Sequence, residues 1–225
     1  MKSDYLGILS SIKQDIERYQ ISQTSKPSLI VVTKSQSNKD IEKVVEAGNK
    51  CLGENYVDEA IKKINFFKTR SLEWHFIGQI QSNKIKKISE YFDWVQTISS
   101  IKHAKLLNQA CEGLSKKMNI CIQVNIDREQ SKSGILIEDL DDLVINILPL
   151  NNLILRGLMA IPSKINALKE NINSYKILKA EYDRLSSEYI HMDTLSIGMS
   201  NDYKLALDNG SNMIRIGTLI FGNRK

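Results

Sequence analysis

Two places in this sequence carry reactive or anion-binding side chains directly after short apolar runs. Lys34 follows the run LIVVT, and the C-terminal stretch RIGT holds Arg215, Gly217 and Thr218. Ser200 lies between them in the chain, after a third apolar run. An amine, a permanent cation, two hydroxyls and a glycine N–H form a donor set suited to an anionic or phosphorylated carbonyl compound.

Lys34 allows three interpretations, because a buried ammonium is costly unless it is paired or neutralised. It is a solvated end-of-strand residue, a point charge for phosphate, or a nucleophile that forms an imine with an aldehyde. At an ordinary lysine pKa near 10.4, roughly a few amines in ten thousand are neutral at pH 7, so imine formation needs desolvation or a neighbouring cation such as Arg215. Pyridoxal 5′-phosphate (PLP) fits this donor set, and a cofactor-free Schiff-base aldolase fits it as well.

Short apolar runs alternate with amphipathic segments along the chain, a pattern typical of parallel strands and helices. A helix is expected at Tyr5–Tyr19, and a second one in SNKDIEKVVEAG, with Ser37 or Asn38 as its cap and Gly48 as its stop. The predicted strands begin at Leu29, Lys50, Trp74, Trp94, Asn119, Leu153, Asp193 and Asn212.

Eight such strands in 225 residues predict an α/β fold, a (β/α)8 TIM barrel with an extra N-terminal helix; a doubly wound open sheet is the alternative. Three prolines and the lack of a Gly/Ser-rich linker favour a single domain over residues 1–225.

A barrel of this kind places its site at the C-terminal ends of the strands, often with a phosphate site after strands seven and eight. Lys34 ends strand one, Asn55 in GENY ends strand two, and the segments around Ser200 and Thr218 end strands seven and eight. Ser200 is expected to cap the helix in SNDYKLALDNG, whose first N–H groups then face the same mouth.

Composition excludes several other classes of protein. Hydrophobic residues make up 42% and charged residues 25% of the chain, and the net charge is +5, with lysines scattered among acids. This pattern indicates a solvated shell and not a nucleic-acid groove. Three cysteines without C-x-x-C spacing favour reduced thiols in the cytoplasm, and no apolar run is long enough to span a membrane. The three histidines show no metal-ligand spacing.

Five segments resemble the pyridoxal phosphate homeostasis protein family, in the same order and over the chain from about Leu29 to Arg224. They are VVTKSQSNKDIEKVVEAGNKCLGENYVDEA, WHFIGQIQSNKIK, QVNIDREQSKSGI, RGLMAIP and LSIGMSNDYKLALDNGSNMIRIGTLIFGNR. The departures are mild: Thr33 stands where serine is usual, Ile80 where leucine is usual, and Asn212 where threonine is common.

The resemblance implies the barrel of the N-terminal half of alanine racemases and a PLP cofactor held as a Schiff base. It also implies a carrier or regulator of PLP without substrate turnover, expected to be a cytoplasmic monomer that serves PLP-dependent apoenzymes. The matching residues are Lys34 for the imine, Ser200, Gly217 and Thr218 for the phosphate, Arg215 near the pyridine nitrogen, and Asn55 of the G-E-N motif.

The expectation of no catalysis begins with Arg215. A guanidinium keeps its proton, so it favours an unprotonated pyridine nitrogen in PLP, and the cofactor ring then withdraws electrons only weakly. Alanine racemases tolerate an arginine at this place, but they add a second domain that supplies a tyrosine base, and such a domain is not expected after Lys225. The alternative is a racemase-like enzyme, for which Tyr56 and His75 are the first candidate bases. Lys132 is a further candidate, as a transient acceptor of the aldehyde during hand-over.

Overall fold

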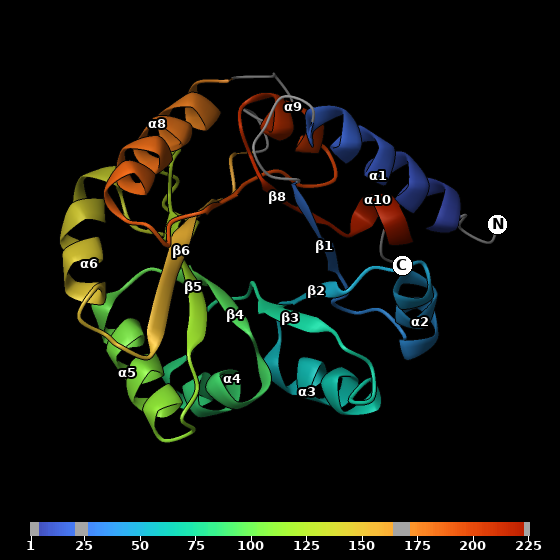
Figure 1. Ribbon diagram of the computed structural model, residues 1–225, viewed down its shortest axis with the longest axis horizontal. Helices are drawn as coiled ribbons and strands as arrows, with labels where there is room; N and C mark the ends of the chain where they lie inside the picture. The colour runs from blue at the N-terminus through green and yellow to red at the C-terminus, as the bar shows by residue number, and fades with distance from the viewer. Residues whose placement is uncertain (1–4, 21–26, 164–171, 223–225) are drawn as a thin grey trace.

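Eight parallel strands form a closed barrel in the computed structural model, which describes residues 5–20, 27–163 and 172–222 (Figure 1). The barrel closes because β1 pairs with β8, with Leu29 opposite Ile214, as well as with β2. The strands are β1 (Ser28–Val32), β2 (Cys51–Glu54), β3 (Glu73–Phe76), β4 (Trp94–Ile98), β5 (Met118–Val124), β6 (Leu153–Ala160), β7 (Thr194–Ser196) and β8 (Met213–Ile216).

Helices lie around the outside of this ring of strands, as Figure 1 shows. The N-terminal helix α1 is an addition to the repeating strand–helix order and contacts α2, α9 and α10. The helices are α1 (Tyr5–Gln20), α2 (Asn38–Glu46), α3 (Val57–Phe66), α4 (Ile85–Tyr91), α5 (Ile101–Glu112), α6 (Leu140–Ile147), α8 (Asn173–Glu188), α9 (Tyr203–Asp208) and α10 (Thr218–Phe221), with 3₁₀ turns at Ser82–Lys84 and Ile137–Asp139.

The sequence-based predictions of the fold are confirmed. Each strand begins within one residue of its expected start, and the β1–β8 pairing excludes the open doubly wound sheet. The predicted cap of α2 is also confirmed: Ser37 Oγ accepts a hydrogen bond from the backbone N–H of Asp40, and Gly48 follows the helix with a φ of +82°. A positive φ at Gly48 is the left-handed conformation that commonly ends a helix.

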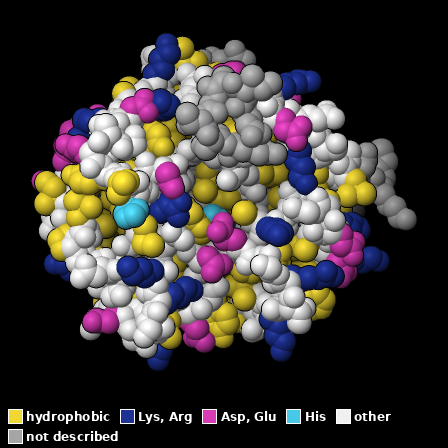
Figure 2. Space-filling view, in the orientation of Figure 1, with side chains coloured by type: hydrophobic (Ala, Val, Ile, Leu, Met, Phe, Trp, Pro, Cys, Tyr) yellow, Lys and Arg dark blue, Asp and Glu magenta, His cyan; other side chains and the backbone are white. Residues whose placement is uncertain are grey.

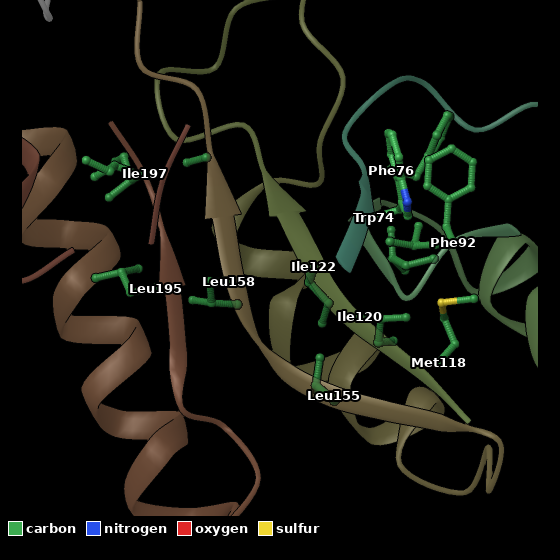
Figure 3. Packing of buried hydrophobic residues seen from close by; sticks show 14 of the residues in the cluster. Trp74, Phe76, Phe92, Met118, Ile120, Ile122, Leu155, Leu158, Leu195 and Ile197 are labelled. Atoms are coloured by element: carbon green, nitrogen blue, oxygen red, sulfur yellow. The ribbon is translucent and has the colours of Figure 1, made fainter. Parts of the chain in front are cut away.

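Most of the buried apolar side chains lie between the sheet and the helices. Figure 3 shows Ile120 and Ile122 of β5 and Leu155 and Leu158 of β6 within this layer. A smaller apolar cluster contains side chains from five strands, at the inward-facing positions of the barrel. Its buried members are Ile30, Trp94, Cys121, Met159 and Met213.

Lysine, arginine and acidic side chains are interspersed on the face shown in Figure 2. Such mixing agrees with the solvated shell that the sequence predicts. Among the described residues, none of the helices combines the length and the hydropathy needed to cross a bilayer.

Candidate functional site

A cavity of about 140 Å³ lies where β1, β7 and β8 end. It brings together five of the six residues singled out from the sequence, although they come from positions 34, 200 and 215–218 of the chain. The lining residues are Val32, Lys34, Gln36, Met199, Ser200, Arg215, Gly217, Thr218 and Gly222.

Lys34 reaches this cavity because it continues the inward-facing positions of β1. Side chains alternate along a strand, so Ile30, Val32 and Lys34 share one side, and Ile30 belongs to the cluster inside the barrel. Lys34 is half-buried and lines the cavity together with Val32. The next residue, Ser35, has a φ of +61°, which turns the chain sharply away after the lysine.

A buried ion pair holds the backbone on either side of Lys34. Lys63 Nζ, from α3, lies 2.7 Å from Glu54 Oε1 and donates to the carbonyl oxygen of Thr33 at 2.6 Å. Thr33 Oγ1 donates to the same Glu54 oxygen at 2.6 Å. Lys63 also pairs with Glu59, whose carboxylate accepts the N–H of Ser35. Sequence reasoning missed this network; its visible signal is the i,i+4 spacing of Glu59 and Lys63, which is also common on solvated helix faces.

Burial raises the pKa of Glu54, and the ammonium of Lys63 opposes that rise. The other carboxylate oxygen, Oε2, is buried and has no hydrogen-bond partner among the described residues. The network therefore depends on Lys63, since a buried carboxylate without a cation is strongly destabilising.

Arg215 lies in the cavity wall with its guanidinium held by two partners inside the barrel. Nη1 donates to Ser196 Oγ at 2.5 Å, and Nη2 donates to the carbonyl oxygen of Ala160 at 2.9 Å. Burial lowers the pKa of Arg215 to about 10, so the side chain keeps its charge at pH 7. The cavity wall thus carries a fixed cation as well as the side chain of Lys34.

Ser200 lies in the cavity wall, but the prediction that it caps a helix is wrong. Helix α9 begins at Tyr203, and Asp202 occupies the cap position, where its Oδ1 accepts the N–H of Met199. Ser200 Oγ instead accepts the N–H of Leu219 at 3.1 Å, in the first turn of α10. The hydroxyl therefore joins the loop after β7 to the first turn of α10.

Gly217 brings the backbone after β8 close to β1. A Cβ added here would lie 3.0 Å from the carbonyl oxygen of Val32 and 3.1 Å from its Cβ, which is tighter than ordinary contact. Gly217 precedes the short helix α10, and Thr218, its first residue, is exposed. The glycine lets the chain lie against β1 beside the cavity, where a side chain would press on Val32.

Asn55 does not line this cavity. It follows β2, and its Oδ1 is buried without a hydrogen-bond partner in the described part of the chain. Its backbone lies against Gly78, where an added Cβ would be 2.0 Å from the Asn55 carbonyl oxygen. The position of Asn55 is therefore fixed by close packing of the β2 and β3 loops.

The two candidate bases lie away from the cavity lining. Tyr56 is 58% exposed, and His75 is fully buried inside the barrel, between Gln96 and Glu73. The sequence shows no metal-ligand spacing for the histidines, but the strand register gathers Cys51, Glu73 and His75 within 4.8 Å of one another. This group lies toward the N-terminal ends of β2 and β3, at the opposite end from Lys34.

The side chain of Lys132 forms an ion pair and hydrogen bonds with residues of the loops around it. Its Nζ lies 2.8 Å from a carboxylate oxygen of Glu129 and donates to the carbonyl oxygens of Ile161 and Pro162. Lys132 is not among the residues that line the cavity. These contacts favour a role in holding the β5 and β6 loops together.

The family model described as "Alanine racemase, N-terminal domain" matches residues 9–225. The chain is 40% identical over 224 residues to the pyridoxal phosphate homeostasis protein of Pasteurella multocida, covering 96% of each chain. PipY of Synechococcus elongatus, solved without PLP, has a TM-score of 0.88 and 29% identity over 97% of this chain and 100% of PipY. PipY with PLP bound has a TM-score of 0.81 and 28% identity, over 94% and 100%. The chain therefore belongs to the alanine racemase N-terminal domain family and, within it, to the pyridoxal phosphate homeostasis proteins.

Proposed function

We propose that this protein binds PLP covalently through Lys34 and serves PLP homeostasis as a carrier or regulator without substrate turnover. The observation that carries the proposal is the convergence of Lys34, Arg215, Ser200, Gly217 and Thr218 on one cavity. The name of the Pasteurella multocida relative and the PLP-bound structure of PipY support it.

The donor set of the cavity fits the parts of PLP. Two hydroxyls, from Ser200 and Thr218, and the closely approaching backbone at Gly217 suit a phosphate group. When bound, PLP supplies an aldehyde, to which the neutral amine of Lys34 adds with loss of one water molecule. Arg215 would donate an N–H hydrogen bond to the pyridine nitrogen. Asn55 lies outside the cavity lining, and we propose that it would act on the cofactor from the β2 loop as a more distant partner.

Arg215 supports the proposal that the protein does not turn over a substrate. The guanidinium stays protonated at pH 7 and therefore favours an unprotonated pyridine nitrogen, which withdraws electrons weakly. Among the described residues that line the cavity there is no carboxylate, imidazole or phenol to act as an opposing base. The residues that line the cavity are therefore better suited to binding and releasing the cofactor than to catalysis on a substrate.

The remaining features of the proposal concern the protein's context. Residues 1–225 act as one PLP-binding domain, which works as a monomer and exchanges PLP with PLP-dependent apoenzymes. Three free cysteines support a reducing compartment such as the cytoplasm.

The absorbance of the purified protein tests this function. Wild-type protein, as purified and free of unbound PLP, should carry a visible absorbance band; Lys34→Ala should lack this band, and Lys132→Ala should keep it. A cofactor-free aldolase would be colourless as purified. Incubation with D- and L-amino acids in deuterium oxide then tests turnover: exchange at Cα faster than with free PLP would establish a racemase-like enzyme and refute the carrier.

A further inference from the structure

A row of hydrogen-bonded polar side chains crosses the inside of the barrel beneath the cavity. Arg215 Nη1 lies 2.5 Å from Ser196 Oγ, and that hydroxyl lies 2.8 Å from Gln96 Oε1. Gln96 Nε2 lies 3.0 Å from His75 Nδ1, and His75 Nε2 lies 2.8 Å from Glu73 Oε1. We call these five residues the polar column; they come from β8, β7, β4 and β3.

All the hydrogen bonds of the polar column run in one direction. A guanidinium can only donate and a carboxylate can only accept, so Arg215 and Glu73 fix the two ends. Ser196 accepts from Arg215 and must donate to Gln96 Oε1, which leaves Gln96 Nε2 to donate to His75 Nδ1. The proton of the neutral His75 ring is then on Nε2, where it is donated to Glu73.

The charge states of His75 and Glu73, at the end of the polar column away from Arg215, agree with this direction. Burial lowers the pKa of His75, so the imidazole is neutral at pH 7. The hydrogen bond from His75 lowers the pKa of Glu73 to about 2, so the carboxylate is ionised. His75 is also held in place by stacking on Trp94, with ring centroids 5.2 Å apart.

The polar column lies in an apolar interior, where buried polar side chains are unusual. Barrel interiors are usually filled by branched apolar side chains, and the cluster around Trp94 and Met159 beside the column is apolar. Polar groups in such a place are costly unless every partner is satisfied. Apolar side chains would fill the interior at lower cost, but they would offer no partner to the Nη1 of Arg215.

We propose that Ser196, Gln96 and His75 are positioning residues that orient the Arg215 guanidinium toward the pyridine nitrogen of bound PLP. This inference rests on the function proposed above. Glu73, whose side chain is 44% exposed at the other end of the barrel, anchors the polar column. The hydrogen bonds that fix the position of Arg215 thus extend through the inside of the barrel as far as Glu73, beyond the wall of the cavity.

Three variants separate positioning from packing. Ser196→Ala and Gln96→Leu each break the polar column, whereas Thr97→Val removes a buried hydrogen bond from Thr97 Oγ1 to the Gly78 carbonyl, outside the column and also on β4. The first two should release PLP about fivefold faster and shift the visible band, since one hydrogen bond contributes about 1 kcal/mol. Thr97→Val should match the wild type in both. If Gln96→Leu does not fold, Ser196→Ala, the smaller change, decides.

A second readout needs no cofactor. NMR of protein labelled with ¹⁵N-histidine should show His75 as the neutral Nε2–H tautomer, and the Nδ1 resonance should move in Gln96→Leu but not in Thr97→Val. An Nδ1–H tautomer in the wild type, or release rates in Ser196→Ala equal to those of Thr97→Val, would overturn the inference. A wild type that never binds PLP would instead refute the proposed function, and the positioning role with it.

Discussion

Replacing Lys63 with methionine tests whether the buried ion pair holds the strand end that carries Lys34. The side chains of Lys63 and Glu54 are 5% and 0% exposed, and Lys63 Nζ also donates to the buried carbonyl of Thr33. Methionine fills a similar volume but leaves the Glu54 carboxylate without its cation. The free energy of unfolding should therefore fall by about 3–5 kcal/mol, the usual cost of breaking a buried pair.

Urea unfolding at pH 7, followed by far-UV circular dichroism, measures this loss. Lys62→Met is the matched control, because Lys62 is an exposed neighbour on the same helix, and its effect should stay within about 0.5 kcal/mol. The double variant Lys63→Met/Glu54→Gln should regain more than about 1 kcal/mol, because the stranded charge is gone. A loss below about 1 kcal/mol in Lys63→Met would refute the reasoning.

The same variant carries a pH dependence of known sign. Burial raises the pKa of Glu54 in the folded protein above its unfolded value. The folded state then binds the proton more tightly, so the stability from this group is present at low pH and is lost as pH rises through the folded pKa. Without Lys63 the pKa rises further, and the deficit of Lys63→Met should be larger at pH 8 than at pH 5. An equal deficit at both pH values would contradict this origin.

Three further outcomes are expected. Gly78→Ala should lower the free energy of unfolding by about 2 kcal/mol or more in urea titrations, because its Cβ would meet the Asn55 carbonyl oxygen at 2.0 Å; a change near zero would contradict that packing. Ser200→Ala should weaken PLP binding about fivefold in absorbance titrations, while the exposed Asn201→Ala should not; equal affinities would remove Ser200 from the phosphate site. Burial raises the pKa of Cys121 to about 12, so iodoacetamide at pH 8 should leave it unmodified by mass spectrometry until the protein unfolds; rapid labelling would contradict this burial.

Local patterns explain how much of the fold the sequence could predict. Strand and helix periodicity is a property of neighbouring residues, so the strand at Leu29 and the cap at Ser37 could be found without tertiary information. The barrel rule then placed Lys34, Ser200 and Thr218 at one end, and they do line one cavity.

The predicted cap at Ser200 failed because a tertiary contact decides where α9 begins. Asp202 accepts hydrogen bonds from the Met199 N–H and from the hydroxyl of Tyr175, which lies 27 residues away in the chain. Serine and aspartate are comparably good caps, so the local sequence could not choose between Ser200 and Asp202.

The interior networks could not be predicted for a similar reason. Thr33 and Lys63 are 30 residues apart, and Gln96 and Ser196 are 100 residues apart. Each residue on its own is an ordinary polar side chain in a strand or a helix. The register of the closed barrel brings Gln96 to Ser196, and the packing of α3 on the strands brings Lys63 to Thr33. Both are tertiary contacts that the local sequence does not specify.

The measurement that tests the central claim most directly is a peptide map of the protein after incubation with PLP and reduction with borohydride. Reduction makes the lysine linkage permanent, so the mass of each peptide shows which lysine carries the pyridoxyl group. We predict one modified peptide, the one that contains Lys34. A pyridoxyl group on a different lysine, or on none, would contradict the assignment of this cavity as the PLP site.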